Sequence, residues 1–209
     1  MASKSTKLIL APVVDIVLPA SEEELETVFD PNTRKLIGAL HRRFWDRRRK
    51  LLQERATGKL DIEPAFTSPE PAGAYGEVVA DLRDNHTGWE QRLNSFVSLQ
   101  TALTDRPEHS PAAIVRVRGW EETEPGVLVD GRAVPSCIVD VAIAMSLAAP
   151  HLREGVEALV VDIEESGDGA EAKLWGDLLQ LAEDRTGVER GTVSLGTLIE
   201  VEGAHAAVA

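Results

Sequence analysis

The stretch Ala112–Glu122, AAIVRVRGWEE, decides the fold of this chain. Its first half is a short, continuous apolar run, which is typical of a strand buried on both faces of a parallel sheet. Two arginines, Arg116 and Arg118, stand at the end of the run and are followed by Gly119 and Trp120. The whole chain has a formal net charge of −13, so two cations at the end of a buried strand indicate an anionic partner nearby.

Outward from this stretch, strands of the same type alternate with helical patterns. A hairpin with a type I′ turn at Asp130-Gly131 follows the central strand. Alternation of helices with continuously apolar strands predicts an α/β fold, either an open doubly wound sheet or part of a (β/α) barrel. The expected strands lie at residues 76–82, 112–119, 157–164 and 191–201, and the helices that separate them at 85–103, 136–152 and 170–187.

An N-terminal helical region precedes this pattern. Ser21 and Glu24 have the spacing of a capping box, which predicts a short helix. Asp30 and Pro31 predict the start of a longer helix that ends at Gly58. A segment rich in proline, glycine and small polar residues comes next and is interpreted as a linker. The predicted parts are a helical region, a linker and an α/β domain, at residues 1–58, 59–76 and 77–209.

Composition predicts a soluble protein. The chain has 209 residues, is 43% hydrophobic and contains no long unbroken apolar run, so no membrane span is expected. An apolar run near the start is interrupted by Pro12 and Asp15 and is interpreted as mature sequence. The single cysteine, Cys137, is expected to be a small core residue, and its isolation predicts a reducing, cytoplasmic location.

Nucleic acid is not an expected partner, because the chain is strongly acidic. The one basic run is HRRFWDRRRK, residues 41–50, which falls inside the long predicted helix. On such a helix, arginines form the solvated face and aromatic side chains the buried one. We therefore expect acidic groups of the same chain to be the partners of these arginines.

Charged side chains follow all four predicted strands. Because the carboxyl ends of parallel strands meet at one edge of a sheet, these groups are expected to lie together. Such a set could hold a divalent cation through Glu200 and an anionic or enolate oxygen through Arg116. Solvated or ion-paired residues at the edge of the sheet are the alternative interpretation. The residues are Asp81, Arg83, Asp84, Arg116, Arg118, Trp120, Asp162, Glu164, Glu165, Glu200 and Glu202.

Several segments have the residues, spacing and order of one family's motifs. They are ALHRRFWDRRRKLL, ADLRD, IVRVRGW, VDGRAVPSCIVD and AEAKLWGDLLQLAEDRTGVERGTVSLGTLIEV. Over most of residues 36–209 the chain resembles malate synthase of the A type, which condenses glyoxylate with acetyl-CoA. The resemblance implies a partial TIM-barrel-like (β/α) architecture with about four parallel strands. It also identifies the N-terminal helical region as that family's helical clasp.

The resemblance implies roles for five residues. Arg116 is expected to be the catalytic arginine that faces the glyoxylate and enolate oxygens. Arg118, Gly119 and Trp120, in the same motif, are expected to bind substrate, and Glu200 to bind Mg²⁺. The implied substrates are glyoxylate and acetyl-CoA, and the implied reaction is a transferase step of the glyoxylate cycle.

The chain also departs from the family's pattern. Arg83 replaces the glutamate of the family's ADFED motif, and the strand at 157–164 lacks the family's LPK motif. The second half of the barrel and the C-terminal domain, which supply another metal ligand and the catalytic aspartate, are expected to be absent. Three interpretations stay open: an enzyme completed by a homodimer or by a second polypeptide, an inactive scaffold or binding subunit, and a fragment of a longer product.

Overall fold

The computed structural model describes residues 13–58, 76–83, 89–105, 112–153, 159–162 and 169–196. The helices in these ranges are α1 (Glu22–Val28), α2 (Pro31–Ala56), α3 (Trp89–Thr104), α4 (Ser136–Arg153) and α5 (Gly169–Thr186). The strands are β1 (Val14–Ile16), β2 (Gly76–Asp81), β3 (Ala112–Arg116), β4 (Thr123–Val129), β5 (Arg132–Pro135), β6 (Leu159–Asp162) and β7 (Val193–Gly196).

A parallel sheet of four strands, in the order β2-β3-β6-β7, organises the molecule. Every neighbouring pair in it is parallel, as the continuous apolar strands predicted. Ala113, Val115 and Val161 are fully buried, which explains why the sequence of these strands does not alternate with polar residues. Asp81, Arg116, Asp162 and Gly196 occupy one row of the register at the carboxyl end of the sheet.

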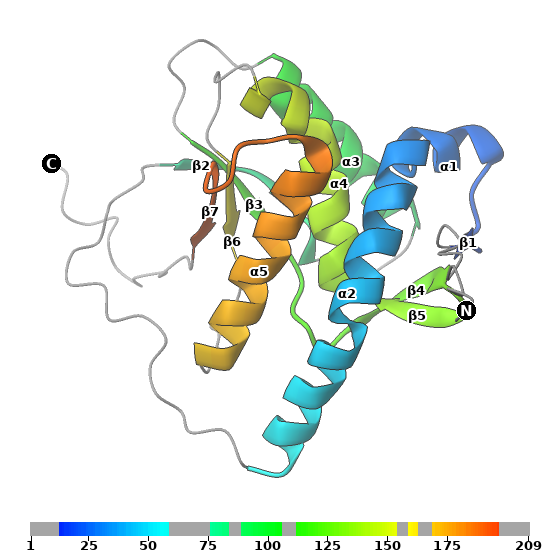
Figure 1. Cartoon of the computed structure of the whole chain (residues 1–209). Coiled ribbons are helices and arrows are strands. Elements are labelled where there is room, and N and C mark those ends of the chain that lie inside the picture. Colours follow the sequence, from blue (N-terminus) through cyan, green and yellow to red (C-terminus); the bar gives the residue numbers. More distant parts are fainter. Residues whose placement is uncertain are drawn as a thin grey trace, which may run out of the picture.

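Helices pack beside this sheet and against one another (Figure 1). α3 contacts β2, α4 contacts β6, and α5 contacts β7, while α2 packs on both α4 and α5. The predicted starts of the N-terminal helices are confirmed: Ser21 and Glu24 form the capping box of α1, and Asp30 caps α2 ahead of Pro31. The caps satisfy backbone N–H groups that the first helical turn leaves without partners.

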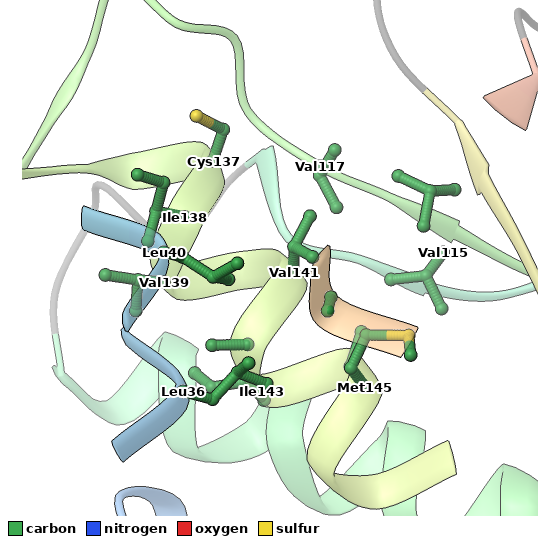
Figure 2. Close-up of a cluster of buried hydrophobic side chains, with 14 of the residues drawn as sticks. Leu36, Leu40, Val115, Val117, Cys137, Ile138, Val139, Val141, Ile143 and Met145 are labelled. Atoms are coloured by element: carbon green, nitrogen blue, oxygen red, sulfur yellow. The ribbon is translucent and has the colours of Figure 1, made fainter. Parts of the chain in front are cut away.

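α4 lies at the centre of the hydrophobic core. Figure 2 shows its side chains meeting those of α2 and of the segment around β3, with Leu40, Val115 and Met145 among them. A helix that is apolar on every side belongs in a protein core or a membrane. Among the described helices, α4 alone has the length and composition of a membrane span, but 72% of it is buried inside the molecule. We therefore interpret α4 as the core helix of the domain.

The structure contains a second sheet, of three strands, in addition to the predicted parallel sheet. It is antiparallel, in the order β1-β4-β5, and β1 joins it through the pairs Val14 with Val129 and Ile16 with Val127. The predicted β4–β5 hairpin is present, and Asp130 and Gly131 both have positive φ, as a type I′ turn requires. Of the described strands, β1, which has only three residues, was therefore the one not predicted from the sequence.

Two features of the structure concern the predicted division into a helical region, a linker and an α/β domain. The interpreted linker, 59–76, lies almost entirely outside the described residues. The region 1–58 and the region 77–209 share the antiparallel sheet, because β1 comes from the first and β4 and β5 from the second. The boundaries themselves stay predictions.

Candidate functional site

The carboxyl end of the parallel sheet brings Arg116 next to Asp81. Asp81 ends β2 and Arg116 ends β3, and the two residues are partners in the register. The distance from Arg116 Nη1 to Asp81 Oδ2 is 3.6 Å. The Arg116 side chain is 15% exposed, so its guanidinium lies at the boundary between the core and solvent. Of the site residues expected from the sequence, Arg116 is therefore placed where a small anion could reach it.

A second arginine holds the same carboxylate. Arg83 donates through Nε to Asp81 Oδ1 at 2.9 Å and through Nη2 to Oδ2 at 2.6 Å, and its backbone N–H also reaches Oδ1. The hydrogen bonds from Arg83 lower the pKa of Asp81 below its usual value, with the Arg116 charge adding to the effect. Asp81 is therefore ionised at neutral pH and already bound to cationic groups of its own chain.

The described residues do not make a magnesium site by themselves. No group of three or more His, Cys, Asp or Glu side chains in the described part of the chain could hold a metal ion. Asp81, one of the register partners of Arg116, is turned toward guanidinium groups. Glu200, the expected Mg²⁺ ligand, lies outside the described residues. Its role stays a prediction.

Arg118 lies in the core within a network of four charged side chains. It donates to Asp140 through Nε at 2.9 Å and through its backbone N–H at 3.0 Å. Its Nη2 is also 2.6 Å from Glu124 Oε2, and Glu124 in turn binds Arg92. Burial alone would lower the pKa of Arg118, but Asp140 and Glu124 outweigh it and raise that pKa. The network holds two positive and two negative charges, and all four side chains are at most 4% exposed.

Trp120 and Gly119 lie in the segment after β3. The Trp120 ring is fully buried and packs against Phe44 of α2 and Trp175 of α5, with centroids 6.2 and 5.1 Å away. Arg48 of α2 donates to the carbonyls of Trp120, at 2.5 Å, and of Glu121, at 2.9 Å. A Cβ on Gly119 would lie 2.7 Å from the Glu121 carboxylate, so this glycine allows that side chain to approach.

The structure thus divides the expected motif. Arg116 lies at the edge of the sheet, whereas Arg118 and Trp120 are buried among protein groups. Their substrate-binding roles, and that of Gly119, stay predictions. The sequence reasoning missed Asp140 and Glu124, the two buried partners of Arg118. One signal for Asp140 was available, since it is a lone carboxylate inside the apolar run of α4.

A groove of about 440 Å³ leads to Asp81 from the side of the molecule. One wall is β2, including Val78 and Asp81, and the other is a polar face of α3 with Asn94, Ser95 and Ser98. β2 is an edge strand of the described sheet, so the groove runs along an edge that no other described strand covers. Asp81 is therefore reachable from this edge.

Comparisons with known proteins find one family that is similar to part of this chain. Residues 112–208 match the family model described as malate synthase, TIM barrel domain. The matched range contains β3, the segment after it and Glu200. Over this segment the chain is similar to the malate synthases. This confirms the resemblance that the motifs predicted.

Individual malate synthases match beyond the barrel segment. The glyoxysomal malate synthase of Candida tropicalis is 25% identical over 88% of this chain and 44% of its own length. That of Streptomyces clavuligerus is 26% identical over 78% of the chain and 41% of its length, and that of Arabidopsis thaliana is 32% identical over 58% of the chain and 25% of its length. The chain spans less than half the length of these relatives.

Proposed function

We propose that the chain carries the first half of a malate synthase-type (β/α) barrel. In this proposal, it catalyses the Claisen-type condensation of glyoxylate with acetyl-CoA to malate and CoA once a second half is supplied. Four parallel strands in sequential order support the proposal, because an eight-stranded barrel begins in that way. The second half comes from another copy of the chain or from a second polypeptide. The proposed location of the protein is the cytoplasm.

The observation that carries the proposal is the position of Arg116. Its guanidinium lies at the carboxyl end of a parallel sheet, the edge at which (β/α) proteins place their reacting groups. A planar guanidinium donates two parallel N–H bonds, which suits the oxygens of glyoxylate. The same donors stabilise an enolate oxygen as negative charge develops on it, when the acetyl methyl group loses a proton.

Magnesium and the proton acceptor are not assigned to the described residues. Mg²⁺ prefers carboxylate oxygens in octahedral geometry, and Asp81 is engaged by Arg83 and Arg116. Glu200, inside the matched barrel segment, is the proposed ligand from this chain, and further ligands would come from the second half. Gly119 and Trp120, together with Arg118, shape the motif around Arg116 in this proposal.

A second function is favoured by the contact between Arg83 and Asp81. Arg83 stands where the related sequences are expected to have a glutamate, and its guanidinium occupies the Asp81 carboxylate with two hydrogen bonds. A carboxylate neutralised in this way is a poor metal ligand. The alternative function is therefore a catalytically inactive malate synthase-like scaffold or binding subunit that retains the Arg116 anion site.

Calorimetry with glyoxylate, with and without Mg²⁺, tests the proposal together with an assay of CoA release from acetyl-CoA. Magnesium-dependent binding with CoA release would support the enzyme, and binding without release would support the inactive binding subunit. Absence of glyoxylate binding under both conditions would contradict the enzyme and the binding subunit and would favour the inactive scaffold.

Arg116→Lys provides the residue-level test of the same site. A lysine keeps the charge but loses the planar fork, so glyoxylate affinity is expected to fall about tenfold, which corresponds to roughly 1.4 kcal/mol. Arg42→Lys is the control, because Arg42 binds Asp130 at an exposed position on the antiparallel hairpin. An unchanged dissociation constant for Arg116→Lys, measured by calorimetry, would remove Arg116 from the site.

A further inference from the structure

The four charged side chains of the network around Arg118 lie in the core, where their desolvation costs free energy. Arg118, Asp140, Glu124 and Arg92 are between 0 and 4% exposed at their side chains. Removing four charges from water carries a large penalty, which ion pairing only partly offsets, so apolar residues of similar volume stabilise a core at least as well. Stability alone therefore does not account for these residues, which instead hold a particular part of the structure in place.

The part that they hold in place is the backbone directly after Arg116. Asp140 accepts from the backbone N–H of Arg118 at 3.0 Å as well as from both ends of its guanidinium. Two residues further on, Arg48 binds the carbonyls of Trp120 and Glu121. The segment that leaves β3 is thus held by α4 on one side and by α2 on the other.

We propose that Asp140 is a positioning residue for Arg116 and acts through Arg118. The inference rests on the proposed function, in which the Arg116 guanidinium binds glyoxylate and the enolate oxygen. Asp140 holds both the side chain and the backbone of Arg118 in place. Because Arg118 follows Arg116 by two residues, this also holds the backbone from which the Arg116 side chain extends. A preorganised guanidinium binds a small anion without first losing its own conformational freedom. Glu124 serves as the second anchor of Arg118 and is itself held by Arg92.

The test replaces both partners at once. Asp140→Asn alone would leave the buried Arg118 charge without its main partner, which strongly destabilises a fold. The double variant R118M/D140L removes one positive and one negative charge and leaves Arg92 and Glu124 as a neutral pair. Asp140→Glu is the second variant, because it keeps the charge balance but displaces the carboxylate by one methylene group.

Two readouts follow the Arg116 side chain in each folded variant. The first is the calorimetric dissociation constant for glyoxylate, which is expected to rise about tenfold in R118M/D140L and less in Asp140→Glu. The second is the ¹⁵N heteronuclear NOE of Arg116 Nε–Hε, assigned by its absence from the spectrum of Arg116→Lys. We expect this NOE to fall, because the side chain gains mobility.

The matched control is R42Q/D130N, which removes another two-pronged arginine–aspartate pair, at an exposed turn. It is expected to leave both readouts at the wild-type value. A wild-type NOE for Arg116 in folded R118M/D140L, or in folded Asp140→Glu if the double variant does not fold, would overturn the inference. If the wild-type chain does not bind glyoxylate, the proposed function fails, and the NOE alone still decides whether Asp140 positions Arg116.

Discussion

At the scale of single residues, His41 makes the stability of the fold depend on pH. It lies in α2, is 2% exposed and packs against the Trp45 ring. Neither ring nitrogen has a hydrogen-bond partner among the described residues. The pKa of His41 is lowered from 6.5 to about 4, mainly by burial and also by the charges of Arg132 and Arg48, while Asp130 acts in the opposite direction.

The sign of the effect follows from proton binding. Between pH 6.5 and about 4 the unfolded chain binds a proton at His41 that the folded chain does not. The free energy of unfolding therefore has its full value, as far as His41 is concerned, above pH 6.5. It falls as the pH drops, by about 1–2 kcal/mol between pH 7 and 5. Urea denaturation at several pH values measures it.

The comparison variant is His41→Leu, which has no titratable group. Its stability is expected to change less between pH 7 and 5 than that of the wild-type chain, by the His41 contribution. Equal slopes for the two proteins would show that carboxylates elsewhere, and not His41, set the pH dependence.

Residue-level prediction from sequence succeeded where a side chain acts locally. Cys137 is a buried core residue, as its place at the start of an apolar helix indicated, and burial raises the pKa of its thiol. The strand-end position of Arg116 was also predictable from the apolar run before it. The partners of Arg118 were not, because Asp140 lies 22 residues away and no periodicity links the two.

At the scale of elements, the structure confirms the helices that have clear capping signals. Two arginines of the basic run in α2 bind acidic groups of the same chain, as expected: Arg42 binds Asp130, and Arg47 binds Asp177. Arg55, further along α2, binds Glu121 and Glu171. β1 was missed because three residues are too few to show a period, and its partner strand lies more than a hundred residues away.

Gly126 is the residue that lets β1 approach β4. Its φ is +76°, and a Cβ there would lie 2.2 Å from the Val17 carbonyl oxygen. Gly126→Ala is therefore expected to lower the free energy of unfolding by roughly 2–4 kcal/mol, because both backbone strain and a steric clash with the backbone oppose the methyl group. Thermal or urea denaturation measures the loss.

Gly131 provides a control on the same hairpin. Its φ is +74°, but nothing lies within 4 Å of the position that a Cβ would occupy. Gly131→Ala should therefore cost only the backbone strain, about 1 kcal/mol. If the two variants lose the same stability, the contact between β1 and β4 does not depend on the glycine.

At the scale of the whole molecule, the sequence predicted the parallel sheet and its helices but not the three-stranded antiparallel sheet. Four apolar strands separated by helices are enough to predict parallel neighbours, since each connection must cross back over the sheet. The antiparallel sheet joins residues from opposite sides of the interpreted linker, and this long-range pairing leaves no local pattern. The same limit applies to any second half of the barrel, which no spacing within this chain can describe.

The two edges of the parallel sheet are candidate surfaces for pairing with a second chain. Among the described strands, β2 and β7 are the outer ones of this sheet, and an uncovered edge of a parallel sheet readily pairs with another strand. Two copies related by a twofold axis could pair β2 of each with β7 of the other and close eight strands, which buries both edges. We therefore expect sedimentation velocity to show a dimer at micromolar concentration.

Val78→Lys tests which surface forms that dimer. Val78 lies on β2, lines the groove beside α3 and is 41% exposed, so a lysine there is tolerated by the monomer but opposes burial of the edge. Val17→Lys is the control, because Val17 is 73% exposed and follows β1 in the other sheet. A monomer for Val78→Lys with a dimer for Val17→Lys would place the interface at β2. A monomeric wild-type chain would contradict the prediction that a second copy supplies the other half of the barrel.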